Sequence, residues 1–166
     1  MLSEGAITQS WDTAIKAGKH NDASVCLTFH FTCGVHQLID AQVMRVEYPE
    51  LKRAVQLLAL RYQARAILVE DKASGQSVLQ DVRREGALPL IAVQPKGDKL
   101  VRVARITPML ESGLVALPRF APWLAAFEAE VVGFPNGAHD DQVDALSQYL
   151  NWVRDAAMSV PGMRRL

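Results

Sequence analysis

The sequence predicts one α/β domain, in which helices cover both faces of a mixed sheet. Two observations carry this prediction. The first part of the chain contains three strand-like segments, and their connections are too short for crossovers, so they should form an antiparallel meander. The remainder alternates helix-like segments with short apolar runs, an order typical of parallel strands buried on both faces. A length of 166 residues is enough for one domain with its own hydrophobic core.

The meander is expected to contain strands at residues 6–14, 24–33 and 36–48. The second of these is rich in β-branched and aromatic residues (SVCLTFHFTC) and stops at Gly34. Asp12 falls inside the first expected strand, between Trp11 and Thr13. Because aspartate is depleted in strands, Asp12 is either a functional residue or lies at a strand end or edge that faces water.

From Pro49 onward the pattern changes to alternating helices and strands, and proline is favoured in a first helical turn. Pro108 lies inside one of the expected helices. The expected helices cover residues 49–62, 74–85, 97–112, 122–131 and 139–157, and the expected strands cover 66–70, 88–93 and 114–117. The ribonuclease-H-like fold has this order of elements. Some other α/β folds share it, so the order alone leaves the topology open.

Charge and cysteine content narrow the class of protein. Basic and acidic residues balance at 18 each, so any nucleic-acid-binding surface has to be a local patch. The two cysteines, Cys26 and Cys33, have no metal-binding spacing and suggest no disulfide framework. No stretch is long and apolar enough to span a membrane, and no signal peptide opens the chain. These features predict a cytoplasmic protein.

Three carboxylates open the last expected helix, at Asp140, Asp141 and Asp144. Asp141 and Asp144 are one helical turn apart and project from the same face, whereas Asp140 is offset. Like charges placed in this way repel unless a cation lies between them. A divalent metal ion is the usual solution, because hard cations prefer carboxylate oxygens. The alternative is an acidic first turn that complements the helix dipole.

A carboxylate on another element can join this cluster. Glu70 ends the apolar run at residues 66–69, and α/β sheets hold their ligands at the carboxyl ends of such strands. The alternative is that Glu70 is only the first solvent-exposed residue after the buried part of the strand. If the first strand and the Glu70 strand are neighbours, the last helix can bring Asp12, Glu70 and Asp141 toward one point. Such a set can hold two Mg²⁺ or Mn²⁺ ions, as in two-metal phosphodiester cleavage.

Basic residues follow one of the expected helices. Lys96 precedes it, and Lys99, Arg102 and Arg105 recur at three-residue spacing, so these three can form one stripe. In a chain without net charge, such a local stripe is where a DNA backbone would bind. The alternative is an ordinary solvated helix face.

Residues beside the carboxylates are candidates for supporting roles. Lys72 follows Glu70 and Asp71, and it either contacts the scissile phosphate or balances charge. His139 abuts the acidic helix start, where it either shuttles a proton or shapes the beginning of the helix. Asp71 and His139 are therefore expected next to the metal ligands.

Three motifs together resemble a known family. The segments SWDTA (10–14), VEDKASG (69–75) and HDDQVDA (139–145) are similar to motifs in the nuclease domain of tailed-phage large terminase subunits. The motifs occur in that family's order, each on the expected element, and the resemblance extends from about residue 7 to residue 152.

The resemblance implies a ribonuclease-H-like fold and a metal-dependent endonuclease that cuts concatemeric viral DNA during genome packaging. It implies that Asp12, Glu70 and Asp141 form an acidic triad, with Mg²⁺ or Mn²⁺ as cofactor. Asp144 and Asp140 are further ligand candidates. Of the helix carboxylates, the pair on one face, Asp141 and Asp144, is favoured over Asp140.

The resemblance also implies partners: double-stranded DNA, the ATPase domain or subunit of the terminase, the portal and the small terminase subunit, in the cytoplasm of a phage-infected or prophage-bearing host. The chain departs from a full large subunit because it lacks a Gly-x-x-x-x-Gly-Lys-Ser/Thr phosphate loop. Residues 1–166 are therefore expected to be one nuclease domain, with a frayed tail at 159–166. Two alternatives stay open: a Holliday-junction resolvase or transposase-like nuclease, and a catalytically silent docking module of the packaging motor.

Overall fold

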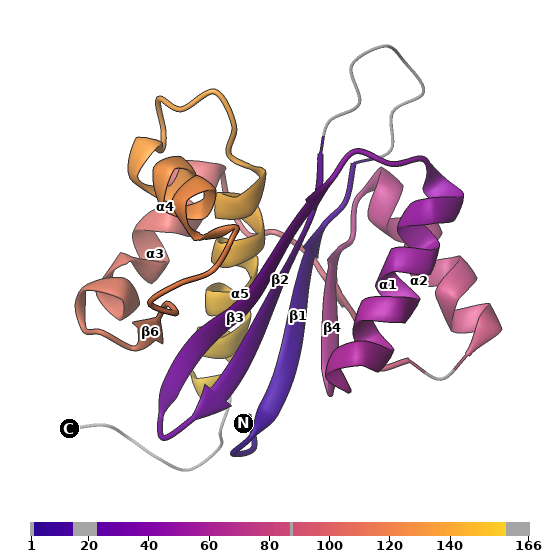
Figure 1. The fold of residues 1–166 in the computed structure, drawn as a ribbon, viewed down its shortest axis with the longest axis horizontal. Coiled ribbons are helices and arrows are strands. Elements are labelled where there is room, and N and C mark those ends of the chain that lie inside the picture. The colour runs from indigo at the N-terminus through magenta and orange to yellow at the C-terminus, as the bar shows by residue number, and fades with distance from the viewer. Residues whose placement is uncertain (1, 15–22, 87, 159–166) are drawn as a thin grey trace.

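The computed structural model of the protein describes residues 2–14, 23–86 and 88–158. The tail expected at 159–166 lies outside these residues. In the described part, the strands form one mixed sheet in the order β5-β4-β1-β2-β3-β6, and helices cover both of its faces (Figure 1). The predicted fold class is therefore confirmed.

The antiparallel meander consists of β1 (Ala6–Asp12), β2 (Ser24–Thr32) and β3 (Val35–Met44). A two-residue turn, Cys33 and Gly34, joins β2 to β3, with φ angles of 51° and 75°. Left-handed conformations at both positions match the twist of a tight hairpin.

The first strand ends earlier than predicted, so Asp12 is the last residue of β1 and does not lie inside it. The reason lies in the hydrogen bonds of the next residues. The Ser24 hydroxyl accepts a bond from the Ala14 backbone N–H at 3.0 Å and donates one to the Ala14 carbonyl at 3.2 Å. These backbone groups thus bond to a side chain, and the strand ladder stops at Asp12.

The third strand also ends early, because the chain turns into the first helix. Helix α1 spans Tyr48–Tyr62, and the Glu50 carboxylate accepts a 3.1 Å bond from the backbone N–H of Glu47, just before the helix begins. This contact fixes the start of the helix at a residue that the prediction had assigned to a strand.

The parallel part of the sheet follows. It comprises β4 (Ala66–Glu70), helix α2 (Ala73–Glu85) and β5 (Leu90–Val93). Strand β4 runs parallel to β1, with Trp11 opposite Val69, and β5 runs parallel to β4, with Val93 opposite Glu70. The carboxyl ends of these three strands therefore lie at the same end of the sheet.

The last part of the chain contains α3 (Lys99–Glu111), β6 (Val115–Ala116), α4 (Leu124–Gly133) and α5 (Asp141–Met158). The Asp98 carboxylate caps α3 by accepting a 2.8 Å bond from the Val101 backbone N–H, so this helix begins two residues later than predicted. Strand β6 pairs in parallel with β3 at the far edge of the sheet.

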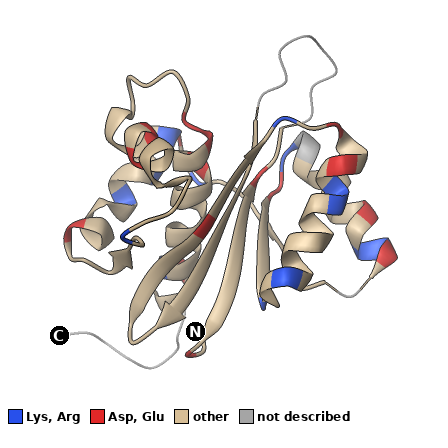
Figure 2. Ribbon diagram, viewed as in Figure 1, with Lys and Arg blue, Asp and Glu red and all other residues tan. Residues whose placement is uncertain are grey.

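The two faces of the sheet have separate cores. Helices α1 and α2 pack around Trp11, whereas α3, α4 and α5 pack around Phe29, which stacks on Tyr149 with ring centroids 3.9 Å apart. Figure 1 shows the two helical layers on opposite sides of the strands. Charged residues of both signs lie mainly on the helices and loops (Figure 2). None of the helices in the described ranges combines the length and apolarity needed to cross a membrane.

Candidate active site

The carboxyl ends of β1 and β4 position the first two candidate carboxylates. Because Trp11 pairs with Val69 in the parallel ladder, the next residues, Asp12 and Glu70, end neighbouring strands. Both side chains line a pocket of about 360 Å³ at this end of the sheet. The two strands are neighbours, which is the condition under which the sequence brings Asp12 and Glu70 together.

Helix α5 is fixed across the end of β1 by polar contacts. The Ser10 hydroxyl donates to the Ala145 carbonyl at 2.8 Å. The Gln148 side-chain amide donates to the Ser10 hydroxyl at 3.0 Å and to the Trp11 carbonyl at 3.2 Å. These bonds hold Asp144 in the same pocket as Asp12.

The beginning of α5 is held by a residue that sequence reasoning missed. The Glu130 carboxylate, on α4, accepts bonds from the Gln142 backbone N–H at 2.6 Å and from the Gln142 side-chain amide at 2.7 Å. A carboxylate at this position also complements the helix dipole. No local sequence signal links the two residues, because the contact depends on how α4 packs against α5.

Asp12 lies at the electrostatic centre of the site. Burial raises its pKa to about 7, and the nearby charges of Asp144, Glu70 and Asp141 contribute to this rise, while Lys99 acts in the opposite direction. The Asp12 carboxylate has no ion-pair partner within the described ranges. The site thus concentrates negative charge around one poorly solvated carboxyl group.

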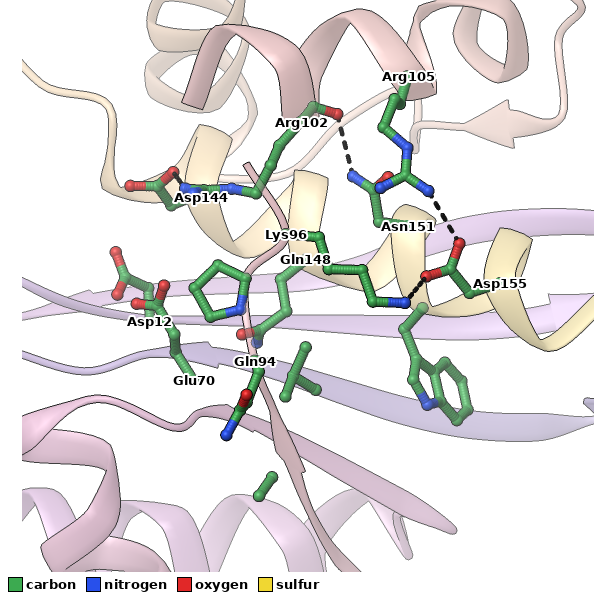
Figure 3. A pocket seen from close by; sticks show the side chains of 14 residues that line it. Asp12, Glu70, Gln94, Lys96, Arg102, Arg105, Asp144, Gln148, Asn151 and Asp155 are labelled. Atoms are coloured by element: carbon green, nitrogen blue, oxygen red, sulfur yellow. Dashed lines mark hydrogen bonds and ion pairs between the residues drawn. The ribbon is translucent and has the colours of Figure 1, made fainter. Parts of the chain in front are cut away.

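Cations from elsewhere in the chain reach the other carboxylates. Lys99 Nζ lies 2.6 Å from Asp140 Oδ2 and 2.7 Å from Asp144 Oδ2. Arg102 Nη2 lies 2.7 Å from Asp144 Oδ1. Figure 3 shows Arg102 extended from α3 toward Asp144, with Asp12 close by. Lys72, which follows β4, pairs with Glu70 at 2.7 Å.

The other predicted helix carboxylates lie beside the pocket and do not line it. Burial raises the pKa of Asp141, and the charges of Glu130 and Asp140 add to this effect. His139 is exposed, and its charge lowers the pKa of Asp141. Asp141 and Asp144 thus differ in environment, although the sequence places them on one helical face.

The remaining predicted residues have partners of their own. Asp71 accepts a 3.3 Å bond from the Gln94 side-chain amide. Lys96 and Arg105 both pair with Asp155 of α5, at 2.9 and 3.0 Å (Figure 3). The predicted basic stripe therefore borders the pocket and is engaged with acidic residues of α5. It is not a freely solvated helix face.

Polar residues of α5 complete the pocket wall, and they are not among the residues predicted from the sequence. They follow Asp144 at helical spacing, which is a signal that could have identified them. These residues are Gln148, Asn151 and Asp155. Trp152 and Gln94 also line the pocket.

The donor chemistry of the pocket fits a hard divalent cation. Asp12, Glu70 and Asp144 offer carboxylate oxygens from three elements, and the cluster contains no thiolate. Across the described residues, no group of three or more His, Cys, Asp or Glu side chains is arranged as a ready metal-binding group. Two of these carboxylates already have ion-pair partners: Glu70 pairs with Lys72, and Asp144 pairs with Lys99 and Arg102. These side chains would have to change rotamer before all three carboxylates could share one ion.

A family of known proteins matches most of the chain. The family described as the terminase RNaseH-like domain matches residues 9–152. None of the curated protein sequences matches the chain.

Solved structures share the fold. The large terminase nuclease from thermophilic phage G20c, with bound cobalt, has a TM-score of 0.70 at 15% identity, over 88% of this chain and 80% of that one. The human cytomegalovirus terminase nuclease domain, Mn soaked and inhibitor bound, has a TM-score of 0.61 at 10% identity, over 93% and 85%. The large terminase from another thermophilic bacteriophage has a TM-score of 0.68 at 11% identity over 93% of this chain, which spans only 41% of that protein.

Proposed function

Because this chain belongs to the terminase RNaseH-like domain family, we propose that it is a metal-dependent DNA endonuclease that cleaves concatemeric viral DNA during genome packaging. Membership confirms the family that the three sequence motifs indicated. The family supports a nuclease role in phage DNA packaging, and the proposal adds the mechanism and the residues that carry it.

One observation carries the proposal. Asp12 and Glu70 end adjacent parallel strands, and α5 places Asp144 in the same pocket. Clustered carboxylates are costly in a protein because their charges repel and burial disfavours ionisation, in line with the raised pKa of Asp12. A cation that these groups share offsets that cost, which favours a metal site over a purely structural cluster.

The cofactor we propose is a pair of Mg²⁺ or Mn²⁺ ions. When bound, such ions supply an activated water as nucleophile and stabilise charge on the leaving 3′ oxygen. The G20c nuclease with bound cobalt and the Mn-soaked cytomegalovirus domain support a divalent metal as cofactor. Bound magnesium in another G20c nuclease structure supports the same choice.

The chain's own residues have distinct roles in this proposal. Asp12 and Glu70 hold the metal from the sheet, and Asp144 holds it from α5. Asp141 stays the sequence-based candidate for a further ligand, with Asp140 behind it. In both of the phage proteins compared above, the similar domain belongs to a large terminase.

Basic residues around the pocket are proposed to hold double-stranded DNA by its phosphates, which positions the duplex without reading its sequence. They are Lys72, Lys96, Lys99, Arg102 and Arg105. The second phage large terminase, solved in complex with ADP and with ATP-γ-S, supports an ATPase domain or subunit as partner. We also propose the portal and the small terminase subunit as partners, and the host cytoplasm as the location.

The test is nicking and linearisation of supercoiled plasmid in Mn²⁺, Mg²⁺ or EDTA. We expect metal-dependent cutting that Asp12→Asn and Glu70→Gln each abolish while the fold is retained. The matched control is Glu85→Gln, which removes a carboxylate from the far end of α2, where it pairs with Lys52 at 2.6 Å. Full activity in Asp12→Asn would remove the site assignment.

The same assay separates the alternatives. A preference for four-way junctions over linear duplex would indicate a resolvase. No cutting by folded protein under any metal condition would favour a docking module. The acidic pocket favours the nuclease, because a docking surface has no need of half-buried, mutually repelling carboxylates.

A further inference from the structure

Asp144 has both of its carboxylate oxygens engaged by cations of α3. Oδ2 lies 2.7 Å from Lys99 Nζ, and Oδ1 lies 2.7 Å from Arg102 Nη2. The Arg102 side chain is only 12% exposed and that of Asp144 19%, so water screens this contact less than it screens a surface ion pair. The pairing is therefore a built feature of the α3–α5 contact.

The same carboxylate faces the candidate metal pocket. Asp144 lines it together with Asp12 and Glu70, and among the neighbouring charges its influence on Asp12 is the largest. A carboxylate held at 2.7 Å by an ammonium and a guanidinium group has little capacity left for a divalent ion. Cations that approach the same oxygens also repel one another. Asp144 can thus become a metal ligand only if it loosens its hold on Lys99 and Arg102.

We propose that Lys99 and Arg102 are displaceable internal counter-ions, which neutralise Asp144 in the metal-free protein and are released toward DNA phosphate when Asp144 ligates a metal ion. The inference rests on the proposed function. It makes metal binding and DNA binding mutually reinforcing, because coupling between two sites is reciprocal. It also accounts for a basic stripe that is paired with acidic residues and yet borders the pocket.

A neighbouring ion-pair cluster provides the comparison. Lys96 pairs with Asp155 at 2.9 Å, and both residues line the same pocket without forming an ion pair with Asp12, Glu70 or Asp144 in the described structure. Removing Lys96 changes the charge near the pocket without freeing a candidate ligand. Lys96→Met is therefore the matched control for Lys99→Met.

The first measurement is Mn²⁺ binding without DNA, by titration calorimetry, in the wild type, Lys99→Met, Lys96→Met and Asp12→Asn. We expect Lys99→Met to bind Mn²⁺ at least about threefold more tightly than the wild type, because a competing cation 2.7 Å from Asp144 is gone. Lys96→Met should stay near the wild-type affinity, and Asp12→Asn should lose the binding. Thermal melting of each variant checks that it is folded.

The outcomes separate the inference from the proposed function. Equal or weaker binding by Lys99→Met, with clear wild-type binding that Asp12→Asn abolishes, overturns the inference and leaves the nuclease site standing. Binding by Lys99→Met alone supports the inference. If neither the wild type nor Lys99→Met binds Mn²⁺, or if Asp12→Asn still binds it, the inference and the proposed function are both overturned.

A second measurement detects the release itself. The affinity of the protein for a short DNA duplex is measured at several salt concentrations, with and without Mn²⁺. A gel verifies that the duplex stays intact. Each added phosphate contact steepens the logarithmic slope by about 0.9. We expect Mn²⁺ to steepen the wild-type slope by an amount that corresponds to about one to two added phosphate contacts. The slope of Lys99→Met should change less. The same Mn²⁺ effect in both proteins overturns the displacement.

Discussion

At the scale of single residues, Asp12 determines how the site responds to pH. Its pKa in the folded protein is about 7, raised from 3.8 by burial and by the carboxylates of Asp144, Glu70 and Asp141. The folded state therefore holds a proton that the unfolded state releases. The resulting stabilisation is complete below about pH 3.8, and it is lost as the pH rises through 7.

We expect Asp12→Asn to raise the free energy of unfolding of the metal-free protein at pH 8, by about 1–4 kcal/mol, with the gain shrinking toward pH 4. Urea denaturation in EDTA at several pH values measures this difference. Wild-type affinity for Mn²⁺ should weaken below about pH 7, because protons compete for the same carboxylate. An Asp12→Asn variant less stable than the wild type at pH 8 would indicate a structural role.

The sequence identified Asp12 and Glu70 because both stand at the ends of strands whose pairing can be anticipated. It favoured Asp141 and Asp144 together, since both lie on one helical face. The structure distinguishes them: only Asp144 lines the pocket. That difference depends on how α5 rotates against β1, which the Ser10 and Gln148 contacts fix at long range. Sequence spacing contains no information about such a rotation.

At the scale of elements, the junction between β4 and α2 sets the position of Glu70. Gly75, in the first turn of α2, lies so close to this strand that a Cβ there would overlap the Glu70 carbonyl oxygen and approach Val69 Cγ1 to 3.2 Å. We expect Gly75→Ala to cost about 1–3 kcal/mol of stability and to reduce cleavage, because the backbone of Glu70 has to move. Thermal denaturation and the plasmid assay measure the two effects.

Gly133, the last residue of α4, is the control for this substitution. A Cβ at Gly133 meets no described atom within 4 Å, so Gly133→Ala should leave stability unchanged or raise it by up to about 1 kcal/mol. Similar behaviour of the two variants would contradict a steric role for Gly75.

Element boundaries show where sequence-based prediction reached its limit. Periodicity located every helix and strand of the described residues, but the ends of β1 and β3 depend on side chains that bond to the backbone. Ser24 ends the first strand by binding Ala14, and Glu50 fixes the start of α1. In the same way, Glu130 holds the beginning of α5 from another helix. The contacts of Ser24 and Glu130 arise only once the elements have packed, whereas the Glu50 contact is local to the start of α1.

At the scale of the whole molecule, metal binding should stabilise the entire fold. The proposed ligands come from β1, β4 and α5, so an ion links both halves of the sheet to the last helix. At about 100 times its dissociation constant, Mn²⁺ should add about 2.7 kcal/mol to the free energy of unfolding. That corresponds to a rise of about 5–10 °C in Tm. Scanning calorimetry should show this rise in the wild type and not in Asp12→Asn. An equal rise in both would place the ion elsewhere.

The hairpin turn between β2 and β3 has a practical consequence. Ala6 pairs with Phe31 and Asp12 with Val25, so Cys33 lies at the end of the sheet remote from Asp12. Its thiol is exposed, whereas Cys26 is buried, and burial raises the pKa of that thiol. A maleimide reagent should therefore modify Cys33 selectively. The molecule has a natural attachment point for a fluorophore or a surface tether, and its proposed binding to DNA could be followed on individual molecules without altering the candidate active site.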